Sequence, residues 1–325
     1  MPLGTLARRG AMATLAVTLA LSAWAAQAQS SKPIRVIVPL STGSTVDTVA
    51  RAMSHHMAQV MGHPVVIENL AGAGGMSGTV QIVNAPKDGM TIGMISSNHV
   101  INPGIYKKVP FDSLNDVTPI TVVGTVPLVL VVSPKVPAKN TKELIALLKS
   151  KPGAVNFGSA GNGSVLHLAG VMFGSEAGVD IVHVPYKGTG PLVTDLMGGQ
   201  VEMAFVSVTA AAQHIKSGKL RALGVSTKER SAVLPDVPTL AESGLPNYSF
   251  DAWIAVIGPA GLPAQIVQKY YADFKTVLAQ TEVKDVLAAQ GIAVINNTPE
   301  QALPFFKAEL EKHTALVKKS GTTAD

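Results

Sequence analysis

The stretch "VNFGSAGNGSVLHLAG" at residues 155–170 joins three local patterns in immediate succession. It begins with a short apolar segment, passes through a loop of glycine, serine and asparagine, and enters an apolar helical pattern. Backbone N–H groups at the start of a helix lack intrahelical partners and carry a partial positive charge. The stretch therefore predicts a strand, a loop and a helix, with a loop that attracts an anion such as a phosphate, a carboxylate or an oxyanion.

Two further loops, "LSTGSTVD" at 40–47 and "YKGTGP" at 186–191, also follow an apolar segment and precede a helical pattern. Strand-like and helical segments alternate through the regions around them, which predicts an α/β architecture with helices on the faces of a parallel sheet. Ligands of such folds bind beyond the carboxyl ends of the strands. The three loops are therefore expected at one ligand-binding edge, although we find no obvious sequence repeat between the two regions.

The composition and the first residues bound the class of protein. The chain has 325 residues, of which 47% are hydrophobic and 14% charged, and it has no cysteine, so it is globular, large enough for two domains and free of disulfides. Arg8 and Arg9, an apolar run at 11–23 and the sequence Ala-Gln-Ala ending at Ala28 predict a signal peptide, residues 1–28, and export to a periplasm. A membrane anchor is the alternative, but the apolar run is too short to span a bilayer.

Several functional classes lack their sequence signatures. The loop "GNGSVL" misses the third glycine of a dinucleotide site, and the chain contains neither a phosphate-binding P-loop nor the G-x-S-x-G turn of a hydrolase. The net charge of +5 is scattered rather than gathered in a basic stripe, and the eight histidines form no metal-binding pair. We therefore expect no cofactor, no metal and no nucleic-acid partner. His167 is equally consistent with packing or function, whereas His99, which follows the strand at 91–96, is the better ligand candidate.

Other segments organise the chain. "VVGTVPLVLVVS" at 122–133 is interpreted as a strand pair or a crossing strand, because Pro127 interrupts it. An amphipathic helix is predicted at 141–153 with Thr141 as its N-cap and Gly153 as its stop, and another helix from Pro191. The closing segment, 253–325, has one strand, two long helices and a short strand between them, so it must pack on one of the earlier regions.

Several ordered blocks also carry a family resemblance. They include "KPIRVIVPLSTGSTVDTVAR", "VVIENLAGAGG", "NPGIYKKVPFDSLNDVTPI", "HVPYKGTGPLVTDLMGGQVEMAF", "LRALGVSTKERSAVLPDVPTLAESGLP" and "GPAGLP". Across residues 32–325 the chain resembles the Bug family, the extracytoplasmic solute receptors of tripartite tricarboxylate transporters. The resemblance implies a two-domain, type II-like periplasmic binding protein fold with the ligand cleft between the domains, and no enzymatic activity. Domain 1 would comprise 29–128 plus 253–325, and domain 2 would comprise 129–252.

The resemblance also implies a site and partners. A small organic acid would be held by main-chain N–H groups, hydroxyls and ordered water from two loops, which correspond here to Ser41, Thr42, Gly43, Ser44 and Thr45 and to Ser159, Ala160, Gly161, Asn162, Gly163 and Ser164. Beside the resemblance, the ends of other strands supply further candidate ligand-binding residues: Ser97, Asn98, His99, Val206 and Ser207. We expect a monomer that delivers its ligand to transporter membrane subunits. The alternatives are a ligand sensor for a sensor kinase of a two-component system, and an exported hydrolase.

Three departures from the family pattern bear on the ligand. The first loop reads "STGSTVD" where the family commonly has P-A-G-G-x-x-D, Val206 stands where Asp is frequent, and Leu70 stands where Arg is usual. Loss of an acidic and a basic side chain suggests a ligand less polar than an amino acid or citrate. We therefore predict an aromatic carboxylate of the benzoate or phthalate type, with a short aliphatic dicarboxylate as the alternative.

Overall fold

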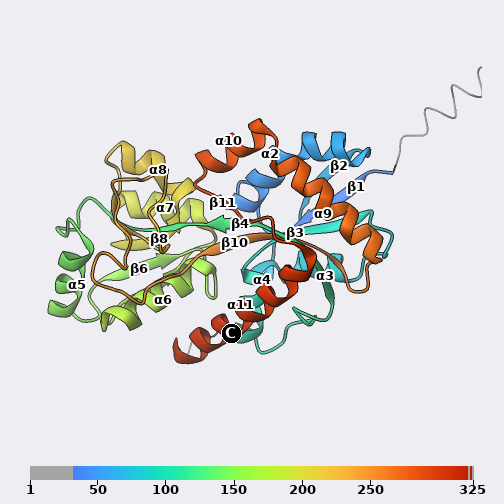
Figure 1. The fold of residues 1–325 in the computed structure, drawn as a ribbon. Helices are drawn as coiled ribbons and strands as arrows, with labels where there is room; N and C mark the ends of the chain where they lie inside the picture. Colours follow the sequence, from blue (N-terminus) through green and yellow to red (C-terminus); the bar gives the residue numbers. More distant parts are fainter. Residues whose placement is uncertain (1–31, 321–322, 324–325) are drawn as a thin grey trace, which may run out of the picture. The chain divides into compact units, whose positions relative to one another are not determined.

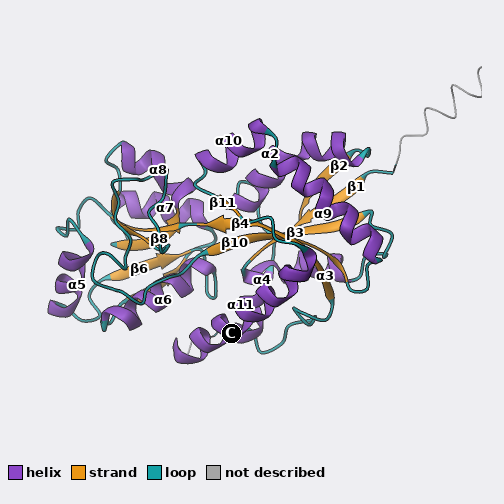
Figure 2. Cartoon of the chain, in the orientation of Figure 1, coloured by secondary structure: helices purple, strands orange, loops and turns teal. Residues whose placement is uncertain are grey.

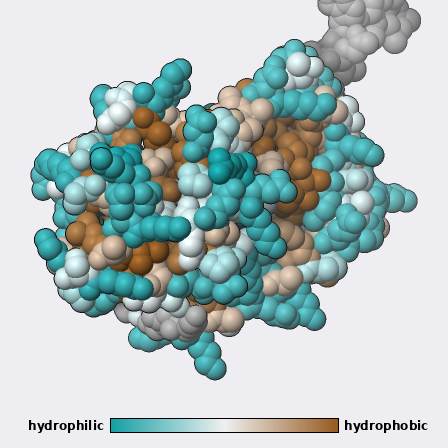
Figure 3. All heavy atoms as spheres, turned by 60° about the vertical axis from the view of Figure 1, so that its left-hand side comes forward, coloured by the Kyte–Doolittle hydropathy of each residue, from teal (hydrophilic) through white to brown (hydrophobic). Residues whose placement is uncertain are grey.

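The protein is represented by a computed structural model that describes residues 32–320 and residue 323 (Figure 1). The predicted signal peptide at 1–28 lies outside the described residues and stays a prediction. Figure 2 shows that the strands of the described chain lie inside and that helices surround them. On the face drawn in Figure 3, hydrophilic residues predominate and hydrophobic ones are exposed in separate patches.

The first sheet contains six strands in the order β11-β4-β10-β3-β1-β2. Their bounds are β1 (Ile34–Val38), β2 (Val65–Asn69), β3 (Thr91–Ser96), β4 (Val117–Val126), β10 (Ala252–Pro259) and β11 (Ala293–Val294). β1 is parallel to β2 and β3, but β10 runs antiparallel to β3 and β4. The expected parallel pairing is confirmed for β1, β2 and β3, but the sheet as a whole is mixed, because a strand from the end of the chain enters its centre in the opposite direction.

The second sheet contains five strands in the order β7-β6-β8-β5-β9. Their bounds are β5 (Leu128–Val132), β6 (Asn156–Ser159), β7 (Val182–Pro185), β8 (Met203–Ser207) and β9 (Arg221–Val225). β6 is parallel to β7 and β8, whereas β5 is antiparallel to β8 and β9. Both sheets are mixed, and in each the parallel pairs are those joined through helices, as such connections require.

Helices cover both faces of the first sheet (Figure 1). One face carries α2 (Thr45–Met61), α9 (Ala264–Leu278) and α10 (Thr281–Ala289), and the other carries α3 (Met76–Val83), α4 (Asn98–Ile105) and α11 (Pro299–Ser320). The short 3-10 turn η1 (Ala73–Gly75) precedes α3. The two faces are buried in separate apolar clusters, which explains why these strands read as continuous apolar runs rather than alternating ones.

The second sheet is covered in the same way by α5 (Thr141–Ser150), α6 (Val165–Ala177), α7 (Thr189–Gly198) and α8 (Val208–Lys216). Within β6, Phe157 packs against Gly170 of α6, whereas Gly158 faces Leu192 of α7. Successive residues of a strand point to opposite faces, so α6 and α7 lie on opposite sides of this sheet. Only glycine fits at position 170 beside this aromatic ring, because a Cβ there would lie 2.1 Å from Phe157.

The chain passes between the sheets at Pro127, which separates β4 from β5, and returns between β9 and β10. The interpretation of 122–133 as a crossing strand is confirmed. The boundaries predicted for the two domains, 128/129 and 252/253, fall one residue inside β5 and β10, just after these two connections, and the division into domains stays a prediction. α11 joins both halves, since its Phe306 packs on the first sheet while its Val317 belongs to the core of the second.

Some helix ends differ from the prediction. The N-cap of α5 is Asn140, whose Oδ1 accepts from the Glu143 backbone N–H at 2.9 Å, and the helix ends at Ser150 rather than at Gly153. Thr141 is instead buried and donates to the Leu223 carbonyl. α7 begins two residues before Pro191, and the helices α4 and α10 were not predicted.

Candidate functional site

The loops that precede α2 and α6 have the same local conformation. Ser44 is the N-cap of α2 with φ −66° and ψ 158°, and Ser164 is the N-cap of α6 with φ −65° and ψ 156°. Each serine Oγ accepts the backbone N–H three residues later, at 3.3 Å and 3.2 Å. The residue before each serine is a glycine in the left-handed region, with φ 81° at Gly43 and 73° at Gly163, and glycine adopts this region without strain.

The likeness extends to the third residue of each helix. Asp47 Oδ2 accepts the Gly43 N–H at 2.9 Å, and His167 Nδ1 accepts the Gly163 N–H at 3.0 Å. The sequences "GSTVD" at 43–47 and "GSVLH" at 163–167 therefore form one repeated motif, a glycine and a capping serine followed by a side-chain acceptor. Sequence reasoning missed this repeat, although the spacing from glycine to acceptor was visible.

The motif determines which amides are left to meet a ligand. The N–H groups of Gly43 and Gly163 are used by Asp47 and His167, and the Gly161 N–H donates to Ser159 Oγ at 3.1 Å. These glycines therefore shape the loops rather than present their own donors. Among residues 32–320, four first-turn amides of α2 and α6 donate to no protein acceptor: those of Thr45, Val46, Val165 and Leu166.

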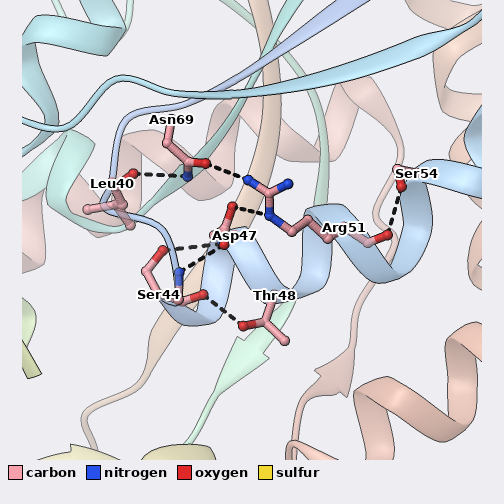
Figure 4. A network of polar contacts seen from close by, with 8 residues as sticks. Leu40, Ser44, Asp47, Thr48, Arg51, Ser54 and Asn69 are labelled. Atoms are coloured by element: carbon pink, nitrogen blue, oxygen red, sulfur yellow. Dashed lines mark hydrogen bonds and ion pairs between the residues drawn. The ribbon is translucent and has the colours of Figure 1, made fainter. Parts of the chain in front are cut away.

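An ionic network supports the first loop (Figure 4). Asp47 is 2% exposed and also accepts from Arg51 Nε at 2.9 Å. Arg51 Nη2 donates to Asn69 Oδ1 at 2.7 Å, and Asn69 Nδ2 donates to the Leu40 carbonyl at 3.1 Å. Burial alone would raise the pKa of Asp47, but the hydrogen bonds from Arg51, Gly43 and Asn69 outweigh it and lower that pKa. The carboxylate is therefore ionised, with Arg51 as its counter-charge.

Two stacked imidazoles support the second loop. The rings of His167 and His183 lie 3.6 Å apart and are inclined by 6°, and His183 Nε2 lies 2.7 Å from Ser159 Oγ. Burial and repulsion from His183 lower the pKa of His167 to about 3, and burial lowers that of His183 to about 4. Both rings are therefore uncharged near neutral pH, and the support carries no net charge.

The second loop touches the half of the molecule that carries the first loop. A Cβ added at Gly163 would lie 2.7 Å from Ile105 Cδ1 of α4. α4 begins after β3, and β3 is parallel to β1, so α4 starts at the sheet edge that also carries the first loop. A Cβ at Gly43 would meet nothing within 4 Å, so space remains open beside the first loop.

The predicted strand-end residues of the first sheet are more buried than expected. His99 is 3% exposed, its Nε2 is hydrogen-bonded to the Ser113 carbonyl at 2.8 Å, and its ring stacks on Phe111. Burial lowers the pKa of His99 to about 4. Within the described chain Ser97 Oγ, Asn98 Oδ1 and His99 Nδ1 have no hydrogen-bond partner. Asn98 and His99 line a cavity of about 10 Å³, which has room for one water molecule.

The remaining predicted residues divide between the surface and the core. Ser41, Thr42, Gly43 and Asn162 are exposed, Ser44, Thr45, Ala160, Gly161 and Ser164 are half-buried, and Ser159 and Gly163 are buried. Val206 is fully buried in β8, opposite Val129, so its side chain lies in the core of the second sheet. Ser207 caps α8 and accepts the Ala210 N–H at 3.2 Å.

A larger cavity lies away from these loops. It has a volume of about 310 Å³, and Ser133, Lys135, Val155 and Glu202 are among the residues that line it. Val155 and Glu202 precede β6 and β8, whereas the loops follow the carboxyl ends of these strands, so this cavity is at the opposite edge of the second sheet. The described residues contain no cluster suited to a metal ion and no helix long and apolar enough to cross a bilayer.

Comparison with known proteins assigns the class. Residues 49–322 match the model of the tripartite tricarboxylate transporter family receptor. The chain is 36% identical to a Pseudomonas sp. protein described as a UPF0065 protein in the tcbD-tcbE intergenic region, over 97% of this chain and 95% of that protein. It is also 36% identical to BugT of Bordetella pertussis, over 90% of each chain.

Solved structures agree with this assignment. The periplasmic binding protein BugD superposes with a TM-score of 0.82 and 32% identity over 90% of this chain and 98% of its own. Two proteins of Rhodopseudomonas palustris also match: MatC with bound malate (TM-score 0.81, 30% identity, 88% and 98% covered) and a protein with adipate (TM-score 0.85, 27% identity, 91% and 99% covered).

The two mixed α/β sheets therefore form a periplasmic binding protein fold. The chain belongs to the tripartite tricarboxylate transporter receptor family, and it is similar to BugT and BugD. The resemblance inferred from the sequence is confirmed, and so is the expectation of a receptor rather than an enzyme. The exported hydrolase is accordingly set aside.

Proposed function

We propose that this chain captures a small organic carboxylate in the periplasm and delivers it to the membrane subunits of a tripartite tricarboxylate-type transporter. The observation that carries the proposal is the repeated motif, which leaves the first-turn amides of α2 and α6 without protein acceptors. Relatives with adipate and with malate support a carboxylate ligand. Closure of two domains around that ligand would complete the site.

The charges around the loops favour an anion held by backbone dipoles. Asp47 and Arg51 form an ion pair at 2.9 Å, so the support of the first loop is neutral overall, and the imidazoles behind the second loop are uncharged. Each charge-assisted hydrogen bond from an amide to a carboxylate contributes about 1.5–3 kcal/mol. Two helix N-termini add favourable dipole interactions without a dedicated cation.

We further propose an aromatic carboxylate of the benzoate or phthalate type. This assignment is supported by the uncharged side chains of Leu70 and Val206, which stand where the family pattern has Arg and Asp. Val206 is fully buried, so we expect no contact between its side chain and the ligand. Its effect would be that this position carries no carboxylate. A short aliphatic dicarboxylate is the competing ligand, and the relatives with adipate and malate favour it.

A thermal-shift screen followed by calorimetry tests both levels of the proposal. Benzoate, phthalate, adipate and malate would be compared with an uncharged amide such as benzamide as the matched control. A ligand at about 100 times its Kd stabilises the folded state by about 2.7 kcal/mol, which is easily observed. Stabilisation by adipate or malate alone would overturn the aromatic assignment, and stabilisation by none of the four acids would overturn carboxylate capture by this site.

A further inference from the structure

We propose that His167 and His183 act as an uncharged pair that positions the second loop for its ligand, with His167 serving this loop as Asp47 serves the first. His167 fixes Gly163 at one end of the turn, and His183 fixes Ser159 at the other. The inference rests on the proposed function only in its statement about affinity. Its statement about the conformation of the loop stands without any ligand.

The hydrogen bonds define the protonation state that the pair needs. His167 Nδ1 accepts an N–H, so this nitrogen carries no proton and the neutral ring has its proton on Nε2. Ser159 Oγ accepts the Gly161 N–H at 3.1 Å and lies 3.0 Å from the Gly161 carbonyl as well as 2.7 Å from His183 Nε2. The pair therefore reaches both Gly161 and Gly163, the two glycines of the turn with positive φ.

The absence of charge is what distinguishes this support. A carboxylate at position 167 could accept the Gly163 N–H as Asp47 accepts the Gly43 N–H. It would also place a negative charge beside the amides of Val165 and Leu166, where an anionic ligand is expected. The first loop compensates its carboxylate with Arg51, but no charged side chain of the described chain is hydrogen-bonded to His167 or His183.

The surroundings keep both rings neutral. The groups that face them are Phe157, whose ring centre lies 4.9 Å from that of His183, the Ser159 hydroxyl, the Gly163 amide and the other imidazole. Burial is the first cause of both lowered pKa values, and within the described chain the one titratable neighbour that also lowers the pKa of His167 is His183. The hold on the loop should therefore persist unchanged from mildly basic pH down to about pH 5.

Three variants at position 167 separate positioning from packing. His167→Asn keeps a side-chain acceptor close to the place of Nδ1, His167→Leu fills the space without an acceptor, and His167→Asp supplies an acceptor with an uncompensated charge. Amide hydrogen exchange at Gly163 reports the loop directly. We expect protection in the wild type, His167→Asn and His167→Asp, and exchange at least about tenfold faster in His167→Leu, because a lost hydrogen bond is worth about one power of ten.

Affinity measured with phthalate and adipate gives the second readout. His167→Asn should bind within about threefold of the wild type, whereas His167→Leu should bind about tenfold more weakly. His167→Asp should hold the loop yet bind more weakly at low salt than at high salt, because salt screens the repulsion. A purely packing role would leave His167→Leu protected and would make His167→Asn the worse variant, and either result would overturn the proposal.

The outcomes also separate this inference from the proposed function. If the wild type binds neither phthalate nor adipate, carboxylate capture is in question, but the exchange of Gly163 in the three variants still decides whether His167 holds the loop. If the wild type binds and His167→Leu matches it in affinity and in protection, the function stands and the positioning pair is wrong.

Discussion

The loops at 41–44 and 161–164 place a glycine and a capping serine in nearly identical geometry, but the side chains behind them differ in charge. Asp47 and Arg51 support the first loop as an ion pair that is partly open to solvent, whereas His167 and His183 support the second as a buried neutral stack. One backbone arrangement is thus compatible with two kinds of electrostatic support. The shared feature is a side-chain acceptor four residues after the glycine, and it engages the glycine amide next to the amides that we propose for the ligand.

The largest contrast between the loops should come from replacing their glycines by alanine. A non-glycine residue in the left-handed region costs about 1–2 kcal/mol, which is the expected loss for Gly43→Ala because its Cβ enters open space. Gly163→Ala adds an overlap with Ile105 and should lose about 1–3 kcal/mol more. Urea unfolding measures both, and equal losses for the two variants would show that Ile105 does not press on the second loop.

A second contrast concerns the acceptor of the first loop. Asp47→Leu leaves the Gly43 amide without its acceptor and Arg51 without its carboxylate, although Arg51 keeps Asn69, and should lower the free energy of unfolding by about 1–3 kcal/mol. Asp47→Asn, which keeps an oxygen for the Gly43 N–H, is the matched control and should lose less. If the two variants unfold at the same urea concentration, the hydrogen bond to Gly43 does not matter.

As the pH falls, the residues that support the second loop should lose their contribution to stability before those that support the first loop. The pKa values of His167 and His183 lie at about 3 and about 4, below the ordinary value of 6.5, so between these values the unfolded chain binds more protons than the folded one. The contribution of these two histidines to the free energy of unfolding therefore falls as the pH drops from 6.5 toward their pKa values in the folded protein. The pKa of Asp47 is lowered from 3.8, so its contribution is lost only in stronger acid.

The comparison that isolates the pair uses the double variant His167→Asn, His183→Gln. Asp251, whose pKa is raised to about 6 chiefly by burial, stays in both proteins and cancels in the difference. Urea unfolding over the range from about pH 7 to about pH 4 should show a steeper loss of stability in the wild type than in the double variant. Parallel curves would mean that the two imidazoles are not held neutral by the fold.

The smallest contrast is the response to salt. Arg51→Gln removes an ion pair within one helix whose Arg51 side chain is half-exposed, and because glutamine can still donate a hydrogen bond to the buried Asp47, the change should cost about 1 kcal/mol, with a smaller loss at high salt. His167→Asn changes no charge near neutral pH, so its effect should be independent of salt. The free energy of unfolding of both variants would be measured at low and at high salt. A salt-dependent effect of His167→Asn would show that the support of the second loop carries a charge.

Much of the local structure was predictable, because strands and loops of this fold are encoded in short segments. The strand, loop and helix expected within 155–170 and the interruption at Pro127 all depend on neighbours in sequence. The mixed direction of the sheets was not predictable from the sequence, since β10 pairs with strands more than 100 residues earlier. No local sequence pattern predicts that long-range pairing.

The conformation of the two loops of the proposed site was largely predictable, but which of their amides lack a protein acceptor was not. The use of the glycine amides by Asp47 and His167 depends on side-chain orientation, and the neutral state of His167 depends on its burial and on His183, which comes from β7. His99 looked like a ligand residue because it follows a strand, yet its burial is decided by Phe111 and Ser113.

The central claim is that amides from both helix starts hold one carboxylate. Its most direct test is an NMR titration of the amide-labelled protein with phthalate and adipate, following the N–H signals of Thr45, Val46, Val165 and Leu166. The account predicts that signals of both pairs shift together, with one common Kd and saturation at one ligand per chain. Tight binding that shifts only one pair, or neither, would contradict it.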